Sequence, residues 1–221
     1  MIYIRKLLTD SQLGDIQKLI PKLSWEDGMI SATSYSKDTK NLDQSIYCHN
    51  HEKISSIIFN SLDDDTEFVQ STLALNTSNP LVSRLRKGNY YRPHHDHYQT
   101  GDYSTTLFLS NPDEYEGGEL NIRLEKDDYR KIKLPAGHAI TYDTGTAHTV
   151  SEVTSGVRYA GVFWTKSSVR DPLMRKTISS IKRANSLLKP IAKDITEVYD
   201  DPHFILDEIT MDLMRQYADD R

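Results

Sequence analysis

The sequence has little that would support a membrane protein, a disulfide-stabilised protein or a nucleic-acid binder. Its one cysteine, Cys48, excludes an internal disulfide and fits a reducing compartment. No apolar run approaches the ~18 residues that a membrane-spanning helix needs, and Arg5 and Lys6 interrupt the start before a signal-peptide core can form. The 27 basic and 32 acidic side chains give a net charge of −5, so a basic field is missing too. We therefore expect a cytoplasmic protein with no membrane partner, and nucleic acid is disfavoured as a partner.

The 221 residues have room for one well-packed domain with additions at its ends. We divide the chain into a mixed, partly helical support (1–80), a β-rich core (81–166) and a helical extension (167–221), which together form one unit. In the core, short runs of β-branched and aromatic residues alternate with turn residues, and no helical pattern intervenes. This pattern predicts an antiparallel sandwich or barrel, with strands at 81–86, 103–109, 119–124, 129–134, 139–142, 148–153 and 157–165.

The support is predicted to contain two short helices. Thr9 is a typical N-cap before apolar residues at helical spacing, and Pro21 ends that first helix. A second helix is expected over 52–62, whereas 25–28 is expected to form a turn.

The extension is predicted to hold two more helices, each beginning at an Asp-Pro pair, 171–172 and 201–202. Residues 166–193 carry eight basic side chains and one acid, whereas 194–221 carry two basic and nine acidic side chains. These helices should therefore lie against each other or against a second copy, so a homodimer through them is one expectation. Their apolar stripes are Met174, Ile178, Ile181 and Leu188, and Ile205, Ile209, Leu213 and Tyr217.

The histidines point to a metal site. Three of the eight occur in the tetrapeptide His94-His95-Asp96-His97. Side chains alternate in an extended segment, so His94 and Asp96 point to one side, away from the other two histidines. His148 begins another predicted strand and can supply a third ligand. Two histidines and one carboxylate form the facial triad of non-haem Fe(II) oxygenases, although zinc sites use the same ligand types.

Arg158 is the second informative residue, because it lies within the strongest predicted strand, ten residues after His148. An unpaired buried charge is costly, so this guanidinium needs an anionic partner. The partner is either a protein carboxylate in a structural salt bridge or the carboxylate of a bound co-substrate, to which a guanidinium can donate two parallel hydrogen bonds. The position beside the third candidate ligand favours the co-substrate.

These residues, on a series of short strands, resemble the iron(II)/2-oxoglutarate-dependent dioxygenases of the prolyl-4-hydroxylase-like branch. The matching positions are His94, Asp96, His148 and Arg158. The resemblance covers roughly residues 1–172 and is specific because the motifs occur together. Further stretches that look like the bacterial PKHD-type hydroxylases are 105–112, 117–120 and 134–137.

The resemblance implies a mostly β protein with flanking helices, built on a double-stranded β-helix of the jelly-roll or cupin-like type. It implies that His94, Asp96 and His148 bind Fe(II), and that Arg158 holds the distal carboxylate of the co-substrate 2-oxoglutarate. Residues 81–166 would then be the catalytic core. O2 and 2-oxoglutarate would be consumed, a substrate C–H bond hydroxylated, and succinate and CO2 released, with ascorbate as a supporting reductant.

Two departures from that family concern the co-substrate and the substrate. Phe108 stands where prolyl hydroxylases often have a tyrosine facing the co-substrate, so we expect Thr106, on the same strand face, to supply a hydroxyl. Trp164 matches a position that lines the peptide groove, and Tyr91 is a second candidate substrate contact, but no arginine matches the one that holds the peptide in some relatives. We expect a prolyl hydroxylase acting on protein or peptide. A free amino acid, small metabolite or nucleic acid as substrate, or a non-enzymatic metal-binding jelly roll, are the alternatives.

Overall fold

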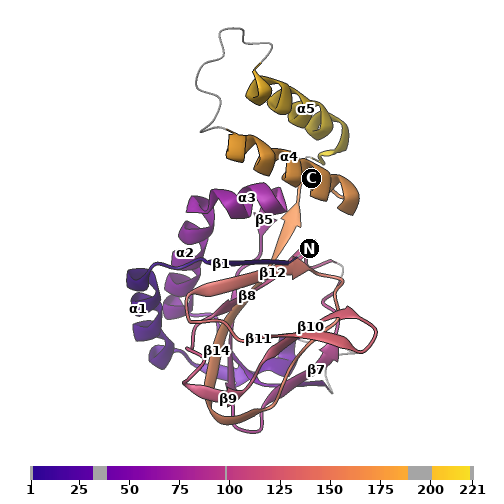
Figure 1. Cartoon of the computed structure of the whole chain (residues 1–221). Helices are drawn as coiled ribbons and strands as arrows, with labels where there is room; N and C mark the ends of the chain where they lie inside the picture. The colour runs from indigo at the N-terminus through magenta and orange to yellow at the C-terminus, as the bar shows by residue number, and fades with distance from the viewer. Residues whose placement is uncertain (1, 32–38, 98, 189–200, 220–221) are drawn as a thin grey trace.

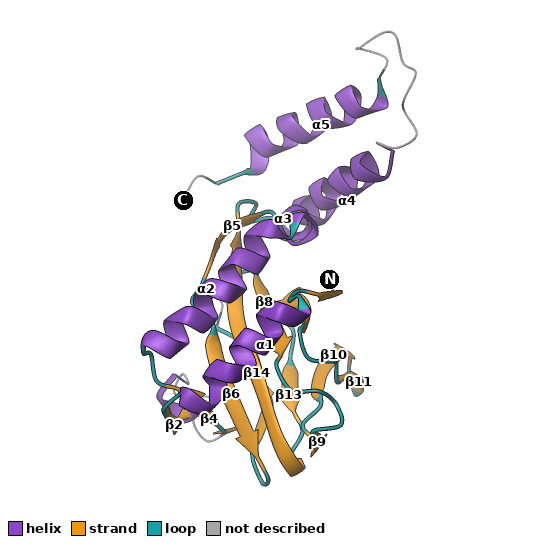
Figure 2. Cartoon of the chain, turned by 90° about the vertical axis from the view of Figure 1, so that its left-hand side faces the viewer, coloured by secondary structure: helices purple, strands orange, loops and turns teal. Residues whose placement is uncertain are grey.

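The computed structural model describes residues 2–31, 39–97, 99–188 and 201–219. Two antiparallel sheets face each other, helices cover the outer face of the larger sheet, and two more helices extend from one end (Figures 1 and 2). The larger sheet has the order β1 (Ile2–Lys6), β12 (His138–Asp143), β8 (Tyr103–Phe108), β14 (Val153–Ser167), β6 (Leu81–Arg86), β4 (Asp43–Ser45) and β2 (Trp25–Asp27), and β14 also pairs with β5 (Ala74–Thr77) and β9 (Tyr115–Gly117). The smaller sheet has the order β11 (Asp128–Ile132), β10 (Leu120–Glu125), β13 (His148–Val150), β7 (Tyr90–His94) and β3 (Lys40–Asn41).

The predicted architecture, mostly β with flanking helices, is confirmed, and each predicted strand run overlaps a strand of the structure. The turn predicted at 25–28 is wrong. Trp25–Asp27 form β2, which pairs with β4, and the ring of Trp25 lies 5.8 Å from that of Tyr159, centroid to centroid. A three-residue edge strand has no periodicity of its own, because its conformation comes from pairing with a distant segment.

The helices beside the larger sheet are α1 (Asp10–Leu19), α2 (His49–Asp64) and α3 (Thr66–Thr72), and a 3-10 turn (Ile20–Lys22) follows α1. The Thr9 hydroxyl accepts a hydrogen bond from the Gln12 backbone N–H at 3.2 Å, so the predicted cap is present. Apolar side chains from α1 and α2 form one buried cluster with the outward-facing side chains of the sheet. Each such side chain stabilises the fold by about 1.5–3 kcal/mol through burial; the central members are Ile16, Ile54, Ile58, Leu107 and Phe163.

The extension consists of α4 (Pro172–Leu188) and α5 (Pro202–Tyr217), and α5 lies along α4 (Figure 2). Ile178 of α4 is fully buried in a small third cluster, as expected. The apolar stripe expected on α5 is only partly covered. Leu213 packs into the cluster together with Met214, whereas Ile205 and Ile209 each remain 42% exposed. This helix has apolar residues on two sides, and only one side faces α4.

A second large cluster fills the space between the two sheets. Near one edge of the sandwich the chain crosses from the smaller sheet to the larger one between β3 and β4, with the buried Leu42 at the crossing. In the described part of the chain, no helix combines the length and the apolar character that a membrane crossing requires.

Candidate metal centre

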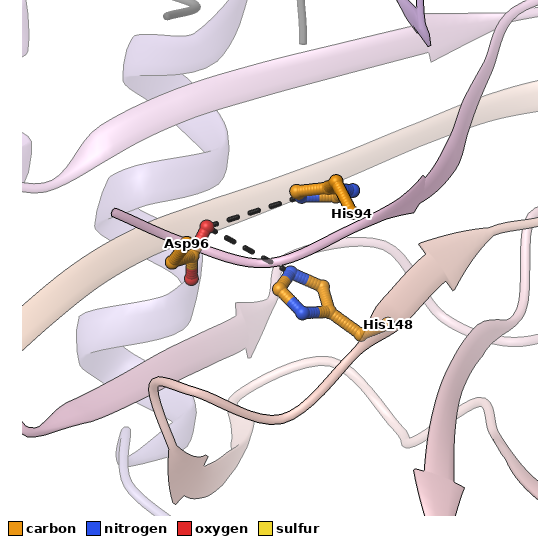
Figure 3. Close-up of side chains that lie close together, drawn as sticks. All are labelled: His94, Asp96 and His148. Atoms are coloured by element: carbon orange, nitrogen blue, oxygen red, sulfur yellow. Dashed lines mark ion pairs between the residues drawn. The ribbon is translucent and has the colours of Figure 1, made fainter. Parts of the chain in front are cut away.

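Strand pairing brings the two candidate histidines together. His94 at the end of β7 and His148 at the start of β13 are directly opposite in the antiparallel register, and their ring centroids are 4.2 Å apart. Asp96 follows two residues after β7, where the chain leaves the sheet, and its carboxylate points toward both imidazoles (Figure 3). Oδ1 of Asp96 lies 3.9 Å from Nε2 of each histidine. The three donor atoms thus lie within 4.8 Å of one another, a separation that one metal ion can bridge.

In both histidines, the ring nitrogen that does not face the centre forms a hydrogen bond with a backbone carbonyl. Nδ1 of His94 contacts the carbonyl oxygen of Arg92 at 2.8 Å, and Nδ1 of His148 contacts that of Thr146 at 3.0 Å. Because a carbonyl only accepts, each Nδ1 carries the proton and each Nε2 presents its lone pair to the centre.

The carboxylate of Asp96 is oriented in the same way. Its Oδ2 accepts hydrogen bonds from the Ser104 hydroxyl at 2.6 Å and from the Trp164 indole N–H at 2.9 Å. Both partners lie on strands of the larger sheet, so that sheet fixes the ligand while the smaller sheet supplies the histidines. Oδ1 is left facing the imidazoles, which is the outer-shell arrangement typical of built metal sites.

The electrostatics of the centre favour a neutral imidazole at His94. Burial and, to a lesser extent, the neighbouring His148 lower the pKa of His94 to about 4. A neutral ring with a free Nε2 is the form that binds a metal. His95 and His97 are exposed, and Nδ1 of His95 contacts the carbonyl oxygen of Gly145 instead.

Arg158 is only 2% exposed, and no Asp or Glu in the described ranges forms an ion pair with it. Its neighbours are aromatic: Tyr115 lies beside it, and its guanidinium carbon lies 5.3 Å from the centroid of Phe108. Nε has no hydrogen-bond partner, and burial lowers the pKa of the group. Gly118, at φ +66°, leaves the space that the stem of Arg158 occupies, since a Cβ there would lie 3.2 Å from Cδ. A buried guanidinium with no acidic partner fits the carboxylate of a small dianion.

One cavity of about 140 Å³ connects this guanidinium with the three candidate ligands. Thr106 lines it, whereas Phe108 lies fully buried beside the guanidinium and outside the lining. Tyr91 and Trp164 line it as well, but each also contacts a candidate ligand. The Tyr91 ring stacks on that of His94 with centroids 3.5 Å apart, while Trp164 holds the carboxylate described above.

Sequence reasoning missed several polar residues around the cavity, among them Tyr142, Tyr115 and Lys40. Tyr142 lines the cavity together with Thr106, and burial raises the pKa of its hydroxyl well above the ordinary value. Tyr115 is buried next to the Arg158 guanidinium. Lys40 lines the wall near Tyr91, with Nζ 5.7 Å from the ring centroid.

Two histidines and one carboxylate around a cavity in a sandwich of two antiparallel sheets match the facial triad of the non-haem iron oxygenases. The model of the 2OG-Fe(II) oxygenase superfamily matches residues 80–166. A PKHD-type hydroxylase of Gluconacetobacter diazotrophicus is 32% identical over 194 residues, which cover 83% of this chain and 85% of the relative. One from Klebsiella pneumoniae is 31% identical over 211 residues, which cover 90% and 92%. The chain belongs to the PKHD-type hydroxylases of the 2OG-Fe(II) oxygenase superfamily.

Solved structures agree on the fold. A Pseudomonas putida prolyl-4-hydroxylase aligns with a TM-score of 0.53 at 11% identity, covering 75% of this chain and 92% of that one. A prolyl hydroxylase from Trichoplax adhaerens aligns with a TM-score of 0.56 at 13% identity, covering 80% and 86%. The core is therefore the expected double-stranded β-helix, and the protein is an enzyme. Family membership implies Fe(II), 2-oxoglutarate and O2 as its reagents and argues against a non-enzymatic module.

Proposed function

We propose that His94, Asp96 and His148 hold one Fe(II) ion and that the protein hydroxylates a substrate C–H bond with 2-oxoglutarate as co-substrate. The observation that carries this proposal is Arg158, a buried cation without an acidic partner, in the same cavity as the three donor atoms. When bound, Fe(II) together with 2-oxoglutarate and O2 supplies the oxidising chemistry, with succinate and CO2 as co-products and ascorbate as a supporting reductant.

The protein's own groups orient the reactants and exclude water. Arg158 donates two hydrogen bonds to the distal carboxylate of 2-oxoglutarate, and the hydroxyls of Thr106 and Tyr142 contribute further polar contacts on the same side. The ring of Phe108 packs against the guanidinium of Arg158. Apolar walls keep the rest of the cavity dry, which strengthens each of these interactions; they are formed by Leu42, Leu81, Leu85, Leu120, Val150 and Val162.

We further propose a prolyl residue of a protein or peptide as substrate. The Pseudomonas and Trichoplax proteins are described as prolyl hydroxylases, and the latter was solved in complex with a peptide fragment of hypoxia inducible factor. Tyr91 and Trp164 line the cavity near the candidate ligands and can contact such a ring. The same chemistry on a free amino acid or a small metabolite is the alternative, whereas the net charge of −5 disfavours nucleic acid.

The decisive test is Fe(II)-dependent conversion of 2-oxoglutarate to succinate, measured without added substrate. The wild type should form succinate only with added Fe(II). Asp96→Ala should abolish both succinate formation and Fe(II) binding, because only two of the three ligands of the facial triad would remain. Asp113→Ala, which changes an exposed acid in a turn, is the matched control and should leave both unchanged. Undiminished turnover in Asp96→Ala would remove the proposed triad.

The extension gives reason to propose a homodimer. Phe204, Ile205, Ile209 and Met211 of α5 remain 39–54% exposed. The same helix carries exposed acids, whereas α4 exposes basic side chains, so two copies can place opposite charges together while covering these apolar side chains.

A further inference from the structure

Lys40 reaches the cavity because the chain changes sheets directly after it. In the smaller sheet Lys40 is opposite Tyr91, and four residues later Gln44 is opposite Ser83 in the larger sheet. The crossing segment therefore forms one wall of the cavity, and both Lys40 and Gln44 are part of the lining. This wall lies beside the candidate ligands, since Tyr91 stacks directly on His94.

The Lys40 ammonium is only partly satisfied by the protein. Nζ donates one hydrogen bond to the Ser31 hydroxyl at 2.6 Å, although an ammonium has three N–H donors. No acidic residue within the described ranges forms an ion pair with it, and it is shielded enough that burial lowers its pKa to about 8. Asp96 and Asp27 act in the opposite direction, so the group stays largely charged at neutral pH.

Among the described residues, the cavity lining holds two basic side chains, Lys40 and Arg158, and one acid, Asp96. Asp27 acts on Lys40 electrostatically, but it lies outside this lining and forms no ion pair with it. A bound divalent ion adds two positive charges, and 2-oxoglutarate brings two negative ones to the metal and to Arg158. One positive charge remains, and it lies at Lys40 on the wall beside the ligands. A desolvated charge of this kind is stabilised by an ionic partner.

We propose that Lys40 binds a carboxylate of the substrate, so that the hydroxylated C–H group belongs to an acid-bearing molecule. This inference rests on the proposed function and deepens it, because it names a chemical group that the substrate must carry. The carboxylate can be that of a free imino acid or chain terminus, or an acidic side chain next to the target residue in a peptide. Gln44 and Ser31 add neutral hydrogen-bonding groups at the same wall.

The test compares probes that differ in one charge. Binding is measured by ligand-observed NMR to full-length protein loaded with Mn(II) and 2-oxoglutarate without O2, so that no turnover occurs. The first pair is N-acetyl-proline and N-acetyl-proline amide. The second pair is acetyl-Pro-Asp-amide and acetyl-Pro-Asn-amide. We expect the wild type to bind the acidic member of at least one pair about 10- to 100-fold more tightly, the effect of one hydrogen bond to a charged group. The pair that shows the preference identifies the source of the carboxylate.

The variants assign that preference to Lys40. Lys40→Gln should lose it, Lys40→Arg should retain it, and Lys87→Gln, at an exposed turn, should bind like the wild type. The affinity for 2-oxoglutarate should be unchanged in Lys40→Gln. Three results would overturn the proposal. The first two are no preference for the acid in either pair and a preference that survives in Lys40→Gln. Weaker 2-oxoglutarate binding in Lys40→Gln would also overturn it, by making Lys40 a co-substrate contact. A wild type that prefers the acid but forms no succinate would reject the proposed function alone.

Discussion

The cavity and the C-terminal extension differ in the kind of side chain that each leaves without a partner in the described structure: charged groups in the cavity and apolar groups on the extension. Around the cavity, both sheets contribute: hydrogen bonds from β8 and β14 fix the carboxylate of Asp96, and backbone carbonyls fix the rings of His94 and His148. The extension is held by a small cluster in which Ile178, Leu73 and Val169 are buried, and much of its apolar surface faces outward. The cavity therefore concentrates uncompensated charge, whereas the extension concentrates uncovered apolar area. The first feature calls for a small anion, and the second calls for another protein surface.

The two regions are nevertheless connected at one point. Arg175 of α4 is buried and donates a hydrogen bond at 2.6 Å to the carboxylate of Asp102, which precedes β8. The other oxygen of that carboxylate accepts from the Ser167 backbone N–H at the end of β14. This partly buried ion pair holds α4 against the strands that fix Asp96, so the extension is linked to the elements that position the site.

Removing the buried cation should give the largest effect. Arg158→Met should weaken 2-oxoglutarate binding by about 2–5 kcal/mol, or roughly 30- to 4,000-fold, because the carboxylate loses its buried partner. The free energy of unfolding without ligands should stay the same or rise, since an unpaired buried charge is removed. Calorimetric titration and denaturant unfolding measure the two quantities.

The control for this variant is Arg84→Met, which removes an arginine paired with Asp43 at 2.9 Å. It should lower stability slightly and leave 2-oxoglutarate affinity unchanged. A destabilised Arg158→Met protein with normal co-substrate affinity would mean that Arg158 has a structural role, and the contrast between the two regions would disappear.

A smaller effect is expected when the carboxylate of Asp96 loses one donor. Trp164→Phe keeps the aromatic ring but removes the indole N–H, and we expect Fe(II) affinity to fall by about 10- to 100-fold, as for other outer-shell changes. Trp25→Phe, at the other tryptophan, serves as the control because Trp25 packs on Tyr159 outside the cavity. Equal Fe(II) affinity in both variants would show that Trp164 only lines the cavity.

The smallest effect concerns the extension. If α5 joins two copies, the double variant Ile205→Lys, Ile209→Lys should dissociate the dimer, because each side chain contributes at most about 1.5–3 kcal/mol of burial. Sedimentation velocity at several concentrations measures this, and Leu124→Lys, at an exposed position of β10, is the control. Succinate formation should persist in the monomeric variant. A wild type that sediments as a monomer at all concentrations would exclude the proposed dimer.

The sequence predicted most of the fold and the groups that converge on the cavity, because strong alternation and turn residues mark the core strands. The shared orientation of His94 and Asp96 could be predicted from local spacing, because side chains two residues apart lie on the same side of an extended segment. Tyr142 could not be assigned to the cavity, because side chains on both faces of β12 are buried and alternation therefore does not distinguish the two faces. Lys40 lies in a two-residue strand within a polar stretch, where no periodicity exists. On α5, residues on two sides are apolar, and only the packing against α4 decides which side is covered.

The long strand β14 also limits how this protein can be redesigned or can diverge. It presents Arg158, Val162 and Trp164 to the cavity, while Tyr159 and Phe163 from the same stretch pack against the helices on the other face. Side chains alternate strictly between the two faces of the strand. Inserting or deleting one residue between Arg158 and Trp164 would therefore move the cavity-facing side chains at one end of the stretch to the helix-facing side, and the reverse. Substitution at Val162 can reshape the cavity without this cost. Variation in this strand should therefore proceed by exchange of side chains at constant length, and engineering libraries should keep its length fixed.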